Sequence, residues 1–151
     1  MIGELAIASA NPTSVRELIA ELDCYLEALY PPESRFGLSI EELQDKSVTL
    51  FAAKTNDTVG CGAIQLQAPG YAEIKRMYVR PNMQRKGIGR QIVKQIEAFA
   101  RQANVHTLRL ETGVYQLAAI HLYQQLGYYP IPPFNDYKLD PLCLYFEKNL
   151  I

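Results

Sequence analysis

The 151-residue sequence contains few cysteines, and they follow no known metal-binding or disulfide pattern. Cys24, Cys61 and Cys143 are widely spaced, without a CxxC pair or a Cys/His cluster. Structural metal sites and disulfide frameworks need cysteines grouped at characteristic spacings. The sequence therefore predicts neither a metal site nor a disulfide, and an odd number of cysteines fits the reducing cytoplasm.

The sequence also lacks an excess of either charge and a long apolar run. Fifteen Lys and Arg residues nearly balance sixteen Asp and Glu residues, so no global field favours nucleic acid or an anionic membrane. No apolar run approaches the ~20 residues of a transmembrane helix, and the N-terminus does not resemble a signal peptide. Six of the fifteen basic residues, however, lie between positions 75 and 90. This local positive patch favours a small anionic ligand.

Hydrophobic periodicity predicts an α/β fold, with helices flanking a mixed central sheet, in one domain spanning residues 1–151. The order is roughly β-α-α-β-β-β-α-β-α-β-β. Ser14 with Glu17 matches a capping box for the first helix, and Ser39 with Glu42 matches another for the second. Strands are predicted at 4–9, 47–54, 59–67, 71–79, 106–112 and 142–150, and helices at 14–30, 40–44, from 87 to about 100, and at 116–127.

The stretch from Gln84 to Arg90, "QRKGIGR", lies between a predicted strand and a predicted helix. Backbone N–H groups in the first turn of a helix have no internal partner, and glycines let an anion approach them closely. Arg85, Lys86 and Arg90 add charge, so the stretch suits a phosphate group. The same glycines could also serve only a turn and close packing of the helix on the sheet.

Two familiar phosphate-binding loops do not fit this stretch. A Walker A loop places lysine after its last glycine, whereas Lys86 comes before Gly87. The dinucleotide fingerprint needs a third glycine where this sequence has Ile92. Neither ATP in a P-loop nor NAD is therefore favoured.

A third pattern matches. Residues 79–89 fit V-x-P-x-x-[QR]-x-x-G-x-[GA], which is similar to the acetyl-CoA-binding motif of the GNAT N-acetyltransferase superfamily. Residues 116–130, "QLAAIHLYQQLGYYP", resemble a second segment of that family. The order of strands and helices also matches that of the GNAT family over nearly the whole chain. Several short residue stretches further resemble a bacterial subgroup of small-molecule acetyltransferases.

The resemblance implies a GNAT fold that uses acetyl-CoA as its cofactor. It implies transfer of an acetyl group to a primary amine of a small molecule or peptide, directly within a ternary complex. An acyl-CoA-binding or regulatory module with little turnover remains an alternative, as does another nucleotide- or phosphate-binding protein. Homodimers are common among such relatives.

The resemblance also implies the catalytic residues. Glu73, six residues before Val79, corresponds to a general base that acts directly or through water; the alternative is an exposed strand glutamate paired with Lys75 or Arg76. Tyr123 corresponds to the acid that protonates the leaving thiolate; the alternative is a tyrosine packed in the core.

The implied cofactor-binding residues come from the strand end, the glycine stretch and the last helix. Gln116 stands where the family usually has asparagine, so its side chain reaches further. The full set is Met77, Tyr78, Val79, Gln84, Arg85, Lys86, Gly87, Ile88, Gly89, Arg90, Gln116 and Tyr123. Backbone groups at Met77, Tyr78 and Val79 would supply the oxyanion donors.

Two loops are expected to bind the acetyl acceptor, because the first helices and the last hairpin line the substrate pocket in the GNAT fold. Arg35 could hold a carboxylate, which would suit an amino-acid-like or acidic acceptor; the alternative is a solvated loop arginine. The predicted acceptor-side residues are Tyr30, Arg35, Phe36, Phe134 and Tyr137.

Overall fold

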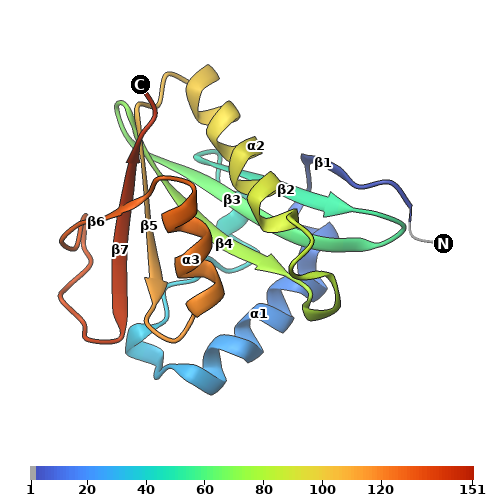
Figure 1. The fold of residues 1–151 in the computed structure, drawn as a ribbon, viewed down its shortest axis with the longest axis horizontal. Helices are drawn as coiled ribbons and strands as arrows, with labels where there is room; N and C mark the ends of the chain where they lie inside the picture. Colours follow the sequence, from blue (N-terminus) through green and yellow to red (C-terminus); the bar gives the residue numbers. More distant parts are fainter. Residues whose placement is uncertain (1–2) are drawn as a thin grey trace.

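The computed structural model describes residues 3–151, which form a seven-stranded sheet in the order β1-β2-β3-β4-β5-β7-β6 (Figure 1). Strands β4 and β5 are parallel, and the other neighbouring pairs of this sheet are antiparallel. The predicted mixed sheet flanked by helices is confirmed. The strands are β1 (Ala6–Ser9), β2 (Val48–Lys54), β3 (Thr58–Ala68), β4 (Tyr71–Val79), β5 (Thr107–Gly113), β6 (Tyr129–Pro130) and β7 (Cys143–Asn149). The helices are α1 (Arg16–Leu29), α2 (Ile88–Gln102) and α3 (Leu117–Gln125), with 3₁₀ turns η1 (Pro12–Val15), η2 (Pro32–Ser34), η3 (Glu42–Gln44) and η4 (Pro81–Met83).

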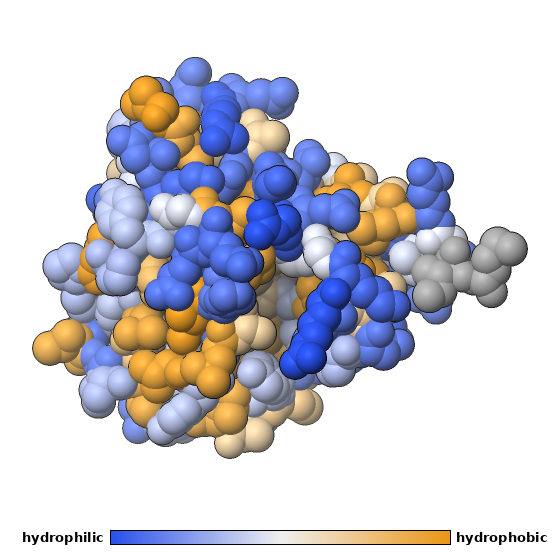
Figure 2. All heavy atoms as spheres, viewed as in Figure 1, coloured by the Kyte–Doolittle hydropathy of each residue, from blue (hydrophilic) through white to orange (hydrophobic). Residues whose placement is uncertain are grey.

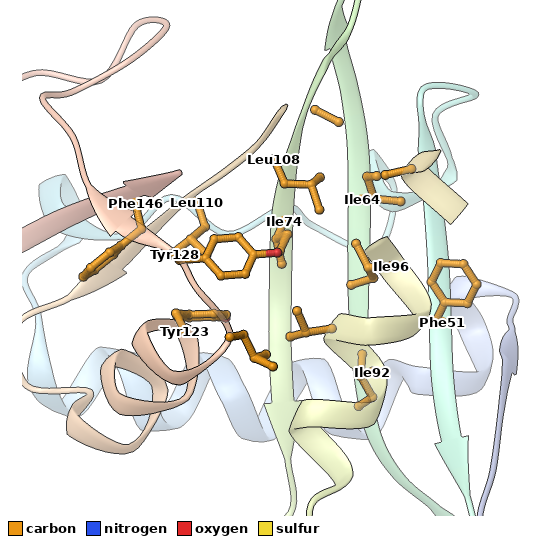
Figure 3. Close-up of a cluster of buried hydrophobic side chains, with 14 of the residues drawn as sticks. Phe51, Ile64, Ile74, Ile92, Ile96, Leu108, Leu110, Tyr123, Tyr128 and Phe146 are labelled. Atoms are coloured by element: carbon orange, nitrogen blue, oxygen red, sulfur yellow. The ribbon is translucent and has the colours of Figure 1, made fainter. Parts of the chain in front are cut away.

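One face of the sheet is covered by α2 and α3. The apolar side of α2 is buried at the predicted spacing and packs against Ile64 and Ile74 of the sheet. Figure 3 shows Ile74 between Ile96 of α2 and Tyr128, which follows α3. None of the helices within residues 3–151 combines the length and apolar character needed to cross a membrane. The buried α2 residues are Ile88, Ile92, Val93, Ile96, Glu97 and Ala100.

Helix α1 lies on the opposite face and is held there by charge as well as by apolar packing. Its carboxylates face the second half of β4: Asp23 lies 2.5 Å from Arg76 Nη2. Glu21 accepts hydrogen bonds from the Tyr78 hydroxyl at 3.1 Å and from Arg80 Nε at 3.2 Å. The apolar part of this contact comprises Val15, Leu18, Ile19, Leu50, Ala52, Cys61 and Ala63.

A β-bulge interrupts β4 and changes which way its side chains point. Arg76 has φ 55°, in the left-handed region, and the pairing with β3 shifts between Cys61 and Ala63. Before the bulge, Lys75 projects toward the face of the sheet that α1 covers; after it, Arg76 projects there as well. The Cys61 thiol donates to the Arg76 carbonyl at 3.4 Å. The bulge therefore brings the alternating pattern of β4 out of phase, so that two consecutive side chains share one face.

The capping box predicted at Ser39 and Glu42 is confirmed. Ser39 N–H donates to the Glu42 carboxylate at 3.0 Å, and Glu42 N–H donates to the Ser39 hydroxyl at 3.1 Å. These bonds lower the pKa of Glu42. The element that they cap is shorter than the expected helix at 40–44, because only the 3₁₀ turn η3 forms.

The capping box predicted at Ser14 and Glu17 is wrong. Ser14 donates its hydroxyl to the Asn11 carbonyl at 2.6 Å, and the Asn11 side chain accepts from Thr13 N–H at 3.0 Å. Pro12 starts the 3₁₀ turn η1 directly after Asn11, so Asn11 is the cap and Ser14 lies inside the turn. The α-helix itself begins at Arg16 without a side-chain cap.

Helix α3 ends in a Schellman motif, which fixes the orientation of its last turn. Gly127 has φ 94°, its N–H donates to the Gln124 carbonyl at 3.1 Å, and Tyr128 N–H donates to the Tyr123 carbonyl at 3.0 Å. The Tyr123 and Tyr128 rings meet edge to face, with centroids 5.8 Å apart. At this end of the helix, both the backbone hydrogen bond and the ring contact with Tyr128 fix the position of Tyr123.

We expect Gly127→Ala to lower the free energy of unfolding by about 1–2 kcal/mol, because an L-residue with a Cβ is strained at positive φ. Gly127→Asn is the matched control and should cost less, since asparagine tolerates the left-handed region. Urea unfolding followed by circular dichroism measures both. An alanine variant as stable as the parent would contradict the prediction.

Candidate active site

Strands β4 and β5 diverge, and a cavity opens between them. They pair only where Tyr71–Glu73 of β4 faces Thr107–Arg109 of β5, although both strands continue beyond this point (Figure 1). The cavity has a volume of about 100 Å³ and is called the β4–β5 cavity below. Its walls come from α1, η2 and the loop after it, both strands, and α3. The lining residues are Leu22, Leu26, Tyr30, Ser34, Arg35, Phe36, Gly37, Glu73, Ile74, Lys75, Arg76, Met77, Glu111, Thr112, Gly113, Gln116, Ala119 and Tyr123.

The segment 85–90, called the amide loop below, leads from β4 into α2. Arg85 and Gly87 adopt left-handed φ values of 64° and 79°. Within residues 3–151, the backbone N–H groups of the amide loop have no hydrogen-bond acceptor. Buried Ile88 anchors the loop, whereas the Arg85 and Lys86 side chains are exposed. Unpaired amides at the positive end of a 15-residue helix are an arrangement that can bind an anion.

The surface around the amide loop combines polar and apolar parts. Figure 2 shows hydrophilic residues at the N-terminal end of α2 beside apolar residues gathered over α3. Gln84 Nε2 donates to the Val79 carbonyl at 2.9 Å, and Arg90 donates to Gln125 at 3.3 Å. A Cβ on Gly89 would come within 3.3 Å of Leu122. Gly89 therefore permits close packing of α2 against α3, rather than the predicted close packing of the helix on the sheet, and binding of a phosphate by this stretch stays a prediction.

Glu73 is buried in β4 and receives several hydrogen bonds. It is 2% exposed, and its carboxylate accepts from the Tyr137 hydroxyl at 2.5 Å and from Gln67 Nε2 at 2.6 Å. Lys75 Nζ lies 3.4 Å away, whereas Arg76 points to α1. Gln67 in turn accepts from Asn135. The burial contradicts an exposed strand glutamate, although the ion pair with Lys75 exists.

Glu111 is a second carboxylate in the β4–β5 cavity, and sequence analysis did not identify it. Burial raises its pKa to about 7; hydrogen bonding to Cys143 and the charge of Lys75 oppose this rise, and Glu73 adds to it. The sequence pattern that could have identified Glu111 is the alternation of side chains in β5, where Leu110 faces the core under α2. Glu111 therefore faces the other way, as Glu73 does on the neighbouring strand, but recognising this required the β4–β5 pairing.

Tyr123 brings its hydroxyl to the same cavity. The residue is 5% exposed, and its hydroxyl has no hydrogen-bond partner among the described residues. Burial, followed by the nearby charge of Glu111, raises the pKa of Tyr123 above its usual value. The phenol therefore stays protonated near neutral pH and remains a hydrogen-bond donor.

Three other residues of the predicted cofactor set differ in what their side chains do. Gln116 lines the cavity, but its Oε1 accepts from Gly113 N–H at 2.9 Å. Met77 lines the cavity. The Tyr78 side chain turns away to Glu21 of α1, which leaves only its backbone at the β4 end of the site.

The five predicted acceptor-side residues divide into two groups. Tyr30, Arg35 and Phe36 line the β4–β5 cavity. The Tyr30 hydroxyl accepts from Tyr115 N–H at 3.0 Å, so its position is fixed. Phe134 and Tyr137 do not line the cavity but pack behind it, with ring centroids 5.0 Å apart. Within residues 3–151, no group of three or more His, Cys, Asp or Glu side chains could hold a metal ion.

Comparison with known proteins gives the family of this chain. Residues 15–128 match the family model described as the acetyltransferase (GNAT) family. The chain belongs to the GNAT family. An IAA acetyltransferase of Azospirillum brasilense is 43% identical over 150 residues, which cover 97% of this chain and 98% of the relative. The uncharacterized N-acetyltransferase YedL of Escherichia coli is 35% identical over 80% of this chain and 77% of its own length.

Solved structures show the same GNAT architecture. A Klebsiella pneumoniae protein assigned as an acyl-CoA N-acyltransferase is 37% identical and superposes with a TM-score of 0.83, covering 97% of this chain and 98% of that one. PaiA N-acetyltransferase of Thermoplasma acidophilum, solved in complex with coenzyme A, is 17% identical with a TM-score of 0.77 and coverages of 97% and 99%. The latter likeness shows the fold, and its ligand illustrates the use of coenzyme A in this family.

Proposed function

We propose that residues 1–151 act as one domain that transfers an acetyl group from acetyl-CoA to a primary amine of a small molecule or peptide, directly within a ternary complex. One observation carries the proposal. The β4–β5 cavity joins two carboxylates and an unpartnered tyrosine hydroxyl at the place where the two strands separate. Amine acetylation needs a proton acceptor, oxyanion donors and a proton donor, and the residues around this cavity can supply all three.

The residues present fit acetyl-CoA, which supplies the acetyl group as a thioester when bound. The amides of residues 85–90 would hold its pyrophosphate, because they are unpaired and lie at the N-terminus of α2. Exposed Arg85 and Lys86 add positive charge there. The backbone of residues 77–79 and the Gln116 side chain would contact the pantetheine arm, since this half of β4 has no strand paired on its β5 side.

The chemistry assigns one step to each group. Glu73 accepts a proton from the acceptor amine, directly or through water, as the amine nitrogen bonds to the acetyl carbon. Backbone N–H groups at Met77, Tyr78 and Val79 stabilise the negative charge on the carbonyl oxygen. Tyr123 donates its proton to the departing sulfur as the carbon–sulfur bond breaks.

The contacts of Glu73 make Glu111 a competitor for the role of base. Both oxygens of the Glu73 carboxylate already accept hydrogen bonds, one from Gln67 and one from Tyr137, so an acceptor amine would have to compete with these contacts. Glu111 has no ion pair among the described residues, and its raised pKa suits proton transfer near neutral pH. Glu73 keeps the role in this proposal if its hydrogen bonds open, or if a water carries the proton to it.

The first prediction from this function concerns ligand binding and turnover. Acetyl-CoA at about 100 times its dissociation constant should raise the melting temperature by roughly 5–10 °C, because a ligand of the native state stabilises it. ATP and NAD are the controls and should not raise it. Thiol release with a panel of amines then separates an enzyme from an acyl-CoA-binding module. A shift without thiol release from any amine would favour the binding module.

We expect Tyr123→Phe to lower kcat by about 100-fold and to change the KM for acetyl-CoA much less, because the hydroxyl acts in the transition state. Tyr115→Phe is the matched control, since Tyr115 is exposed and outside the cavity. Thiol release measures both variants. An unchanged kcat in Tyr123→Phe would remove this residue from the role of acid.

We expect Glu73→Gln to lower kcat by about 100-fold and to alter the pH–rate profile, because a neutral amide cannot accept the proton. Glu111→Gln, made for comparison, should retain more activity if Glu73 is the base. Rates are measured from pH 5.5 to 9. A profile for Glu73→Gln that matches the parent, with the larger loss in Glu111→Gln, would transfer the role to Glu111.

A further inference from the structure

Most charged side chains in the walls of the β4–β5 cavity already have a close partner. Lys75 pairs with Glu73 at 3.4 Å, and Arg76 pairs with Asp23 at 2.5 Å. Lys75 also donates to the Phe36 carbonyl at 3.1 Å and to the Tyr137 hydroxyl at 3.0 Å. Lys75 therefore has little capacity left for an anionic ligand. Arg76 is directed to Asp23 on α1, although its Nε, like that of Arg35, has no hydrogen-bond partner among the described residues.

Arg35 differs from Lys75 and Arg76 in having only a long ion pair to an exposed carboxylate. It pairs only with Glu27, at 3.5 Å, and the Glu27 side chain is 58% exposed. An ion pair of this kind at the protein surface contributes little. The Nε of Arg35 is buried and has no hydrogen-bond partner within the described residues. A buried donor without an acceptor is unfavourable, so this N–H group favours a ligand that can accept from it.

The segment that carries Arg35 is fixed on both sides. The Ser34 hydroxyl donates to Asp140 at 2.6 Å, and the Phe36 carbonyl accepts from Lys75. Arg35 N–H closes the 3₁₀ turn η2 by donating to the Pro32 carbonyl at 3.2 Å. The Arg35 guanidinium is therefore presented to the cavity by an anchored backbone, which limits the entropy lost when it binds a ligand.

Another wall of the cavity carries negative charge. Glu111 on β5 lines the same cavity and, among the described residues, pairs with no lysine or arginine at ion-pair distance. A cationic or amine group near Glu111 and Glu73 is therefore favoured, and an anionic group near Arg35 is favoured. The volume of about 100 Å³ suits a short ligand, since pockets for drug-sized molecules span roughly 300–1,000 Å³.

We propose that the acetyl acceptor is a small amino acid, whose carboxylate binds the guanidinium of Arg35 and whose amine faces Glu73 and Glu111. Arginine binds carboxylates through two parallel N–H groups, and the Nε of Arg35 supplies one of them. Arg35 is then the residue that determines acceptor specificity. This inference rests on the proposed function, because it names the acceptor of the same site.

The test compares amines that differ only in the carboxylate. Glycine, L-alanine, L-leucine and L-phenylalanine are assayed by thiol release beside their carboxamides and the corresponding decarboxylated amines, with rates corrected for the fraction of free amine. The best amino acid should exceed its carboxamide at least tenfold in kcat/KM. Arg35→Gln should reduce this preference to within about threefold and raise the acceptor KM, leaving the KM for acetyl-CoA unchanged. Arg35→Lys should restore part of the preference, and Arg16→Gln, an exposed arginine on α1, is the matched control.

Calorimetry with the same compounds, in the presence of coenzyme A, reports binding independently of turnover. Amino-acid binding that is lost in Arg35→Gln supports the inference even if no acetyl group is transferred, in which case the proposed function fails. Equal kcat/KM for amino acids and carboxamides, or turnover confined to amines without a carboxylate, overturns the inference and leaves the proposed function intact. Failure of all these amino acids to bind or react also overturns it.

Discussion

The β-bulge at Arg76 is the constraint on which both sides of the site depend. By inserting one residue into β4 opposite β3, it directs Arg76 and Tyr78 toward the carboxylates of α1. The same half of β4 separates from β5, so its edge remains open to the cavity. The contacts that dock α1 and the open edge of the sheet therefore lie in the same half of β4. A regular β4 would lose the contacts to α1, because its side chains would alternate in phase from Tyr71 to Val79 and would turn Arg76 and Tyr78 to the other face.

A layer of aromatic side chains excludes water from the floor of the site. Phe134, Tyr137 and Tyr145 pack together behind Glu73, and Arg109 stacks on Tyr71 with its guanidinium carbon 4.2 Å from the ring centroid. In such surroundings each hydrogen bond to a carboxylate carries more weight than it would in water. The hydrogen bonds from Tyr137 and Gln67 therefore determine whether the Glu73 carboxylate can contact a ligand. They also connect the Glu73 carboxylate to the loop between β6 and β7, which carries Tyr137.

Much of the fold could be predicted from the sequence, because local patterns determine it. The apolar spacing in α2 and the capping box at Ser39 depend on residues a few positions apart, and both are confirmed. The Ser14 capping box failed because Pro12 started a tighter turn one residue after Asn11. The pattern of Ser14 and Glu17 therefore predicted the wrong cap, because the actual cap is the nearby Asn11.

The site was less predictable, because its decisive contacts are distant in sequence. Tyr137 reaches Glu73 across 64 positions, and Glu111 joins the cavity only because β5 lies beside β4. The φ value of Arg76 also depends on its pairing with β3, so no pattern in residues 71–79 reveals it. The roles inferred for Glu73 and Tyr123 came from family resemblance, and they stay predictions.

The amide loop has an energetic consequence for the protein without its ligand. Arg85, Lys86 and Arg90 lie beside the positive end of α2, and two residues of the loop hold left-handed backbone angles. Like charges and an ordered, unsatisfied backbone both oppose folding, yet the loop is shaped before any anion arrives. In the proposed function, this loss of stability at folding would be offset by tighter binding of the pyrophosphate. Substitutions that stabilise the free loop would accordingly weaken its hold on an anion.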